Sequence, residues 1–211
     1  TIQFFGIAAT LAATLGTLIA ALPYRGSAGE GFSILNHYIS ELGELGVSRR
    51  AWAFNVGLIL GGMLVIPCYV GLGLLIPGIW SKIGMAAGIT AAVGMFFVGV
   101  FPMNRTTAHT RAANTFFRAG LGMILFFSVA IAAQSEPAPV PRLASLVGLP
   151  AVLAYGFFIV YSEIKGRQLD IEEEPPEAES KPRPRFWLLP FSEWLIFLTT
   201  VPWIFAVVLG M

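Results

Sequence analysis

The sequence predicts an all-α fold: a polytopic integral membrane protein with six transmembrane helices and a short interfacial amphipathic helix. Of its 211 residues, 56% are hydrophobic and only 12% are charged. Soluble domains carry about 25% charged residues. This chain therefore has too few polar side chains to cover a surface that faces water, and lipid is expected to be its main solvent. In addition, the apolar residues fall into six long stretches separated by polar connections.

Each apolar stretch is long enough to cross a bilayer as one helix. About 20 helical residues, at 1.5 Å per residue, span roughly 30 Å of hydrocarbon. Every charged residue except Glu193 falls in a connection or at the end of a stretch. We expect one membrane domain over residues 1–211, with spans at residues 4–23, 53–77, 83–101, 114–134, 143–161 and 186–211.

Small residues recur at four-residue spacing in the first three spans. Ridges of this kind allow helix backbones to approach closely in lipid. We expect them to form seams between helices of this chain, with contact to a partner subunit as the alternative. The ridges are Ala8, Ala12, Gly16 and Ala20; Gly57 and Gly61; and Gly84, Gly88 and Ala92.

The first connection, residues 24–52, is too long for a simple turn. Its apolar residues recur with helical spacing from Leu35 to Leu45, and polar residues lie between them. Ser33 can cap the start of a helix here, and Gly46 favours its end. This pattern predicts the interfacial amphipathic helix.

The fifth connection combines acidic residues, basic residues and proline. Such a segment cannot bury enough apolar area to become ordered. We therefore predict a flexible charged linker over residues 164–185. A contact arm for a neighbouring subunit is the alternative.

The distribution of Lys and Arg predicts the orientation in the membrane. The first, third and fifth connections hold three, three and five of these residues, whereas the second and fourth hold only Lys82 and Arg142. Positive charge is concentrated in cytoplasmic loops. We expect the odd-numbered connections in the cytoplasm and both termini outside, in a protein integral to the cytoplasmic (plasma) membrane.

Composition also limits the partners. A net charge of +1 argues against nucleic acid. Membrane lipids and other membrane-protein subunits are the expected partners. The single cysteine, Cys68, excludes an internal disulfide and a multi-cysteine metal site. The sequence requires no cofactor.

A set of polar residues, which we call the polar ring, is hard to explain as part of a lipid-facing surface. All of its members fall on the predicted cytoplasmic side, around the polar stretch at residues 101–111. This set is the candidate ligand-binding site. It consists of His37, Ser40, Glu41, Asn55, Asn104, Arg105, His109, Arg111, Arg118 and Glu193.

Glu193 is the most unusual member, because it lies seven residues into the last span. An ionised carboxylate at mid-bilayer costs about 2.5–3.5 kcal/mol, and less at this shallower depth. A partner or a wet cavity is therefore expected. Arg118, at the start of the fourth span, is the predicted partner.

Three interpretations of the polar ring stay open. Its members can simply bond headgroups, water and loop carbonyls. Its arginines and the start of the fourth helix can instead recognise an anionic headgroup or another ligand. The third interpretation is metal or acid–base chemistry by His37, Glu41, His109 and Glu193, since the first two are four residues apart and can share an ion. Two histidines without a zinc-type motif give that interpretation little support, so we predict no catalytic residue and no metal site.

Several short motifs resemble one family of bacterial and archaeal membrane proteins, the domain-of-unknown-function 998 (DUF998) family. They are Ser40-Glu41-Leu42-Gly43 followed by Gly46, then Phe54-Asn55, then Gly99-Val100-Phe101-Pro102 and His109. The resemblance covers most of residues 4–162, and a carboxylate early in the last span is similar too. It implies a six-helix protein without an assigned biochemical activity.

The chain departs from the family pattern at two positions. An acidic residue often follows the Phe-Pro pair, where this chain has Asn104. A second histidine often lies four residues after the first, where this chain has Ala113. Losing these two ligand types weakens a metal or catalytic interpretation, while the resemblance still supports the fold and the place of the polar ring.

For function we expect a non-catalytic accessory subunit of a larger membrane complex, which packs against partner helices and holds lipid or a small apolar cofactor. The alternative is a membrane-embedded enzyme that acts on a lipid headgroup at the cytoplasmic-side His, Glu and Arg residues. A transporter ranks third, because no span is visibly broken by paired charges and no inverted repeat is evident.

Overall fold

The structure, a computed structural model, describes residues 1–26, 29–171 and 183–211. These residues form helices joined by irregular connections, without a strand, which confirms the predicted all-α fold. The helices, including two of 3₁₀ type labelled η, are α1 (Ile2–Ala21), η1 (Ile39–Gly43), α2 (Ala51–Leu75), α3 (Ile79–Val100), η2 (Met103–Arg105), α4 (Thr106–Ala133), α5 (Leu143–Val147), α6 (Leu149–Ile171) and α7 (Leu188–Gly210).

Lipid-facing side chains cover the outside of the bundle. In the described part of the chain, six helical segments are long and apolar enough to cross a membrane, as predicted. Large apolar side chains point outward from them, including Leu153 on α6 and Leu74 on α2, which are 72% and 69% exposed. Such exposure is stable only where hydrocarbon replaces water.

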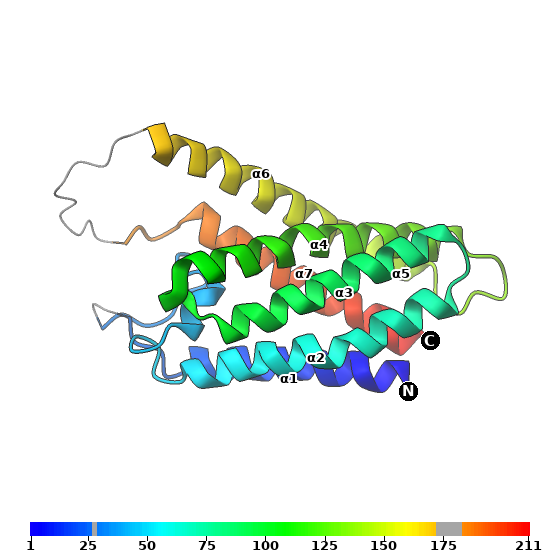
Figure 1. The fold of residues 1–211 in the computed structure, drawn as a ribbon, viewed down its shortest axis with the longest axis horizontal. Coiled ribbons are helices and arrows are strands. Elements are labelled where there is room, and N and C mark those ends of the chain that lie inside the picture. Colours follow the sequence, from blue (N-terminus) through cyan, green and yellow to red (C-terminus); the bar gives the residue numbers. More distant parts are fainter. Residues whose placement is uncertain (27–28, 172–182) are drawn as a thin grey trace.

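The helices are arranged so that distant parts of the sequence meet at one end of the bundle (Figure 1). The first connection, the start of α4 and the start of α7 lie at this end, which we call the polar end. The N- and C-termini lie at the opposite end (Figure 1). The predicted gathering of the odd-numbered connections on one side is therefore present in the fold.

Small residues allow α1 and α2 to pack backbone against backbone. A Cβ atom added at Gly16 would lie 2.5 Å from the carbonyl oxygen of Ala53, and one at Gly57 would lie 2.8 Å from that of Ala12. In α3, a Cβ at Gly88 would lie 2.8 Å from the ring of Tyr69. These ridges are thus seams within the chain, as predicted, and are not left free for another subunit.

The fifth span differs in detail from the prediction. It begins with the short helix α5, and Pro150 then stands in the first turn of α6, where its missing N–H is no loss. α6 continues to Ile171, so the predicted linker at residues 164–185 starts too early. The residues after Tyr161 include good helix formers, and charge does not prevent a helix. Residues 172–182 of that linker lie outside the described residues.

The short helix in the first connection is present but differs from the expected amphipathic one. It is a single 3₁₀ helix of five residues, η1, and Ser40 to Gly43 are buried. Leu35 and Leu45, on either side of η1, are 44% and 54% exposed. The polar side chains of Ser40 and Glu41 face the inside of the bundle, whereas Leu35 and Leu45 lie at its surface.

Candidate functional site

Glu41 forms the centre of the polar end. Its side chain is buried and accepts a hydrogen bond from the Tyr38 backbone N–H at 2.9 Å, which closes a capping box at η1. Arg183 approaches in a bidentate geometry: Nη1 donates to Oε1 at 2.9 Å and Nη2 to Oε2 at 3.0 Å. The Tyr24 hydroxyl donates to Oε2 at 3.3 Å. Glu41 is therefore fully engaged in holding the connection together.

Two tyrosines near this carboxylate are held in their neutral form. Burial raises the pKa of Tyr24 well above its usual range, and the charge of Glu41 raises it further. Burial raises the pKa of Tyr38 in the same way, and the charges of Glu193 and Glu41 add to the effect. Both hydroxyls remain proton donors at any physiological pH.

His37, which belongs to the same connection, is almost completely buried. Its Nδ1 lies 2.8 Å from Oδ1 of Asn36, its Nε2 lies 3.6 Å from Oε1 of Glu30, and its ring packs against Tyr24 and Phe32. Its carbonyl oxygen accepts a hydrogen bond from the Trp194 indole of α7 at 3.1 Å. These contacts position the loop, and they direct His37 to partners other than Glu41.

Two asparagines of the polar ring hold loop backbone. The side chain of Asn104 bonds both polar groups of Leu45: Oδ1 accepts from the N–H at 2.7 Å, and Nδ2 donates to the C=O at 2.9 Å. Asn55 donates from Nδ2 to the carbonyl of Gly43 at 3.0 Å. Both residues therefore link η1 and its neighbouring residues to the bundle.

The predicted ion pair between Glu193 and Arg118 is wrong. Arg118 is exposed and donates to Glu163 of α6 at 2.9 Å. Glu193 is buried and accepts a hydrogen bond from the backbone N–H of Ile39 at 2.8 Å, with a second backbone bond from Ser40. Backbone N–H groups at the start of η1 thus take the place of the expected cation.

The remaining members of the polar ring divide into two groups. Arg105 and Arg111 are exposed at the polar end. His109 is half-buried on the inner side of α4, where its Nδ1 lies 2.8 Å from the carbonyl oxygen of Phe101. Because a carbonyl oxygen only accepts, Nδ1 carries the proton, and Nε2 of the neutral ring is an acceptor.

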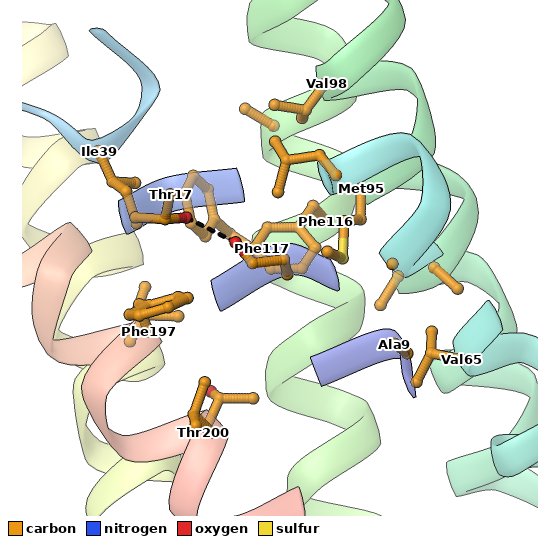
Figure 2. Close-up of a pocket in the computed structure, with 18 of the residues that line it drawn as sticks. Ala9, Thr17, Ile39, Val65, Met95, Val98, Phe116, Phe117, Phe197 and Thr200 are labelled. Carbon is orange, nitrogen blue, oxygen red and sulfur yellow. Dashed lines mark hydrogen bonds between the residues drawn. The ribbon is translucent and has the colours of Figure 1, made fainter. Parts of the chain in front are cut away.

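A cavity of about 140 Å³ lies inside the bundle, below η1. Its walls come from α1, α2, α3, α4, α6 and α7, and Ile39 of η1 closes one end of it. Figure 2 shows Phe116 and Phe117 of α4 and Phe197 of α7 around the hollow. Apolar side chains predominate. The polar side chains in the lining are Thr10, Thr17, Ser40, Tyr69, His109, Tyr155, Glu193 and Thr200.

The structure thus divides the polar ring by role. Ser40, His109 and Glu193 meet at the cavity. The other seven hold loops or face outward. Across the described residues, no three His, Cys, Asp or Glu side chains come together as metal ligands would. The suggested sharing of an ion by His37 and Glu41 does not fit their contacts, because each is committed to other groups.

Sequence reasoning missed the cavity and several residues of the polar end. The sequence places Arg183 in the charged linker, yet its side chain binds Glu41. Two further hydrogen bonds join this segment to the first connection. Asn36 donates from its side chain to the carbonyl oxygen of Pro184 at 2.7 Å, and the backbone N–H of Trp187 donates to the carbonyl oxygen of Leu35 at 2.8 Å. The basic residues just before the last span indicate that this segment lies at the polar end, but their spacing does not identify Glu41 as the partner of Arg183.

The fold and the polar end together define a polytopic integral membrane protein with an internal cavity. Comparison with protein families gives a more specific assignment. The family model described as "Protein of unknown function (DUF998)" matches residues 7–210, so the chain belongs to the DUF998 family. This confirms the resemblance found in the motifs. Neither a curated protein nor a solved structure matches the chain.

Proposed function

We propose that this protein is a non-catalytic membrane protein that holds a lipid chain or another small apolar molecule in its internal cavity. The observation that carries the proposal is the cavity of about 140 Å³, which is lined by residues of six helices. Apolar cavities of roughly 150 Å³ take up ring-sized apolar molecules. An occupant would restore the van der Waals contacts that an empty space of this size lacks.

The alternative of an enzyme acting on a lipid headgroup has less support. Glu41, the carboxylate nearest to His37 in sequence, is engaged by Arg183, Tyr24 and a backbone N–H. A general base needs a free lone pair near a reacting proton. In the cavity lining, an enzyme would have Tyr69, His109, Tyr155 and Glu193 as candidate acid–base groups.

The proposal includes a place in a larger membrane complex. Its support is α6, which diverges from α4 and α7 toward its C-terminal end (Figure 1). Outward-facing apolar side chains of α6, among them Leu153 and Val160, are 72% and 58% exposed. Partner helices of other subunits would cover this face. The charge distribution supports the cytoplasmic membrane as the location, with the polar end in the cytoplasm.

The test of cavity binding is isolation in a mild detergent followed by native mass spectrometry. We expect a bound apolar molecule on the wild-type protein. Ala113→Leu adds volume at the cavity wall and should remove that mass. The matched control is Ala132→Leu, the same substitution at an exposed position of α4, which should keep it. Equal occupancy in both variants would refute the proposed function, and co-isolated subunits in the same sample would support the complex.

A further inference from the structure

The cavity contains a buried carboxylate that is not part of any ion pair in the described structure. Glu193 is 7% exposed and lines the cavity. Among residues 1–26, 29–171 and 183–211, the ion pairs of arginine are Arg118–Glu163, Arg142–Glu136 and Arg183–Glu41, and the histidine–carboxylate contact is His37–Glu30. The bonds from Ile39 and Ser40 are donated by neutral backbone groups, so they orient the carboxylate without supplying a positive charge.

Three other polar side chains on the wall, those of Thr10, Thr17 and His109, present acceptors. The hydroxyls of Thr10 and Thr17 donate to the carbonyls of Gly6 and Ala13 in their own helix, each at 2.8 Å, which leaves their lone pairs for the cavity. His109 donates from Nδ1 to a carbonyl, so Nε2 of its neutral ring is an acceptor. Beside Glu193 an anionic ligand would meet a second negative charge, whereas a cationic ligand would find complementary charge.

Aromatic rings form much of the remaining wall. Phe54, Tyr69, Phe116, Phe117, Tyr155 and Phe197 all line the cavity. The faces of aromatic rings attract cations, and cages of such rings bind substituted ammonium groups. The combination of one carboxylate, several acceptors and several rings favours a charged group that is itself largely covered by carbon.

We propose that the cavity binds a substituted ammonium group, the positive end of an amphiphilic amine, with Glu193 as its counter-ion and the aromatic rings as its walls. This inference rests on the proposed function and names the class of its ligand. The ammonium group belongs either to a free lipophilic amine or to the headgroup of a zwitterionic lipid. Both sources share the same recognition chemistry.

The experiment compares three molecules of nearly equal shape in dodecyl maltoside, a neutral detergent. Phenyltrimethylammonium is cationic, tert-butylbenzene is its neutral isostere, and benzenesulfonate is anionic. Affinities are measured by ligand-observed NMR, with protein-free micelles as the blank. We expect the cation to bind about tenfold more tightly than the neutral isostere, and the anion not to bind.

Two variants localise the effect. Glu193→Gln keeps an oxygen to accept the backbone N–H bond but removes the charge. It should reduce cation binding to the level of the neutral isostere and leave the latter unchanged. Ala113→Leu should weaken both ligands, while Ala132→Leu should weaken neither. Should Glu193→Gln fail to fold, the comparison of the cation with its neutral isostere on the wild-type protein still decides the matter.

The outcomes separate the two proposals. Equal binding of the cation and the neutral isostere, or a preference for the cation that persists in Glu193→Gln, would overturn the ammonium assignment and leave the proposed function intact. Binding of neither would overturn both. Competition by added phosphatidylcholine but not by phosphatidylglycerol would identify the lipid headgroup as the source, and no competition by either would identify a free amine. In both cases the ammonium chemistry stands.

Discussion

The guanidinium of Arg183 and the carboxylate of Glu41 form a two-pronged ion pair, although 142 residues separate them in the chain. Glu41 is buried, and the side chain of Arg183 is 32% exposed. The pair joins the segment before α7 to the first connection. It does so at the polar end, where Glu41 follows the cavity-lining residues Ile39 and Ser40 in η1.

Removing one partner of this pair should destabilise the protein more than removing both. Arg183→Met leaves the buried carboxylate without its cation, and we expect the free energy of unfolding to fall by about 2 kcal/mol. Glu41→Gln should have a similar effect. Denaturant titrations in detergent, followed by tryptophan fluorescence, measure the change. Strict additivity of the two losses in the double variant would show that the pair does not couple.

The buried tyrosines should make the protein sensitive to alkali. The pKa of Tyr24 is raised in the folded state, so folding opposes its ionisation. The stability linked to it is complete below the usual tyrosine pKa of about 10 and is lost as pH rises toward the folded-state value. The free energy of unfolding should therefore fall less steeply above pH 10 in Tyr24→Phe than in the wild type. Tyr38→Phe is the comparison for the second tyrosine, and parallel curves for all three proteins would contradict the assignment.

The contact between α1 and α2 should tolerate no added methyl group. In Gly57→Ala the new Cβ would lie 2.8 Å from a backbone oxygen of α1, which cannot move aside as a side-chain end can. We expect a loss of about 1–3 kcal/mol. Gly156→Ala is the matched control, because a Cβ there meets nothing within 4 Å and alanine favours a helix. A comparable loss in both variants, read as melting temperature in detergent, would rule out the seam as the cause.

The bonds from Asn104 to Leu45 should require an amide. Asn104→Asp keeps an acceptor for the Leu45 N–H but loses the donor to its C=O, and we expect about 1 kcal/mol of destabilisation. Asn104→Leu loses both bonds and should cost more. Hydrogen exchange at the Leu45 amide reports the local effect: it should accelerate strongly in Asn104→Leu and little in Asn104→Asp. Equal exchange rates in the two variants would show that the side chain of Asn104 does not protect the Leu45 amide.

The predicted orientation can be tested with two introduced cysteines. Thr107→Cys is at the polar end and Ser135→Cys follows α4 at the other end, and both positions are exposed. The native Cys68 is buried, so its background labelling should be low. In intact cells an impermeant thiol reagent should label the cysteine at position 135 only, and after lysis it should label both. Labelling at position 107 in intact cells would reverse the topology.

Much of the fold follows directly from hydropathy. The length of the apolar segments predicts six spans and their order. Because successive spans cross the membrane in opposite directions, every second connection lies on the same side, and this collects the polar residues at one end. The close contact of Gly16 with α2 was also foreseeable, because small residues at four-residue spacing form a continuous ridge on a helix. In each case the cause is local in the sequence.

The partners of individual polar residues could not be foreseen. Glu193 accepts hydrogen bonds from two backbone N–H groups. Almost every residue type has such a group, so the sequence does not indicate which residues will donate. Arg118 pairs with Glu163 because α6 extends further than its apolar run. The cavity has the same kind of origin, since it arises from imperfect filling among seven elements of the chain. Such a space depends on three-dimensional packing and leaves no periodic signal.

One consequence of the position of Glu193 concerns the order of synthesis. Its carboxylate accepts the N–H of Ile39, 154 residues earlier, so α7 completes a wall that the preceding helices have already begun. A chain leaves the ribosome from its N-terminus, and α7 therefore reaches the membrane after α1 to α6. Until that moment the hollow lacks the lining residues that α7 supplies, among them Glu193, Phe197 and Thr200. If the cavity holds an apolar molecule, as we propose, that molecule can therefore enter while the helices assemble, before α7 packs against α1 to α6.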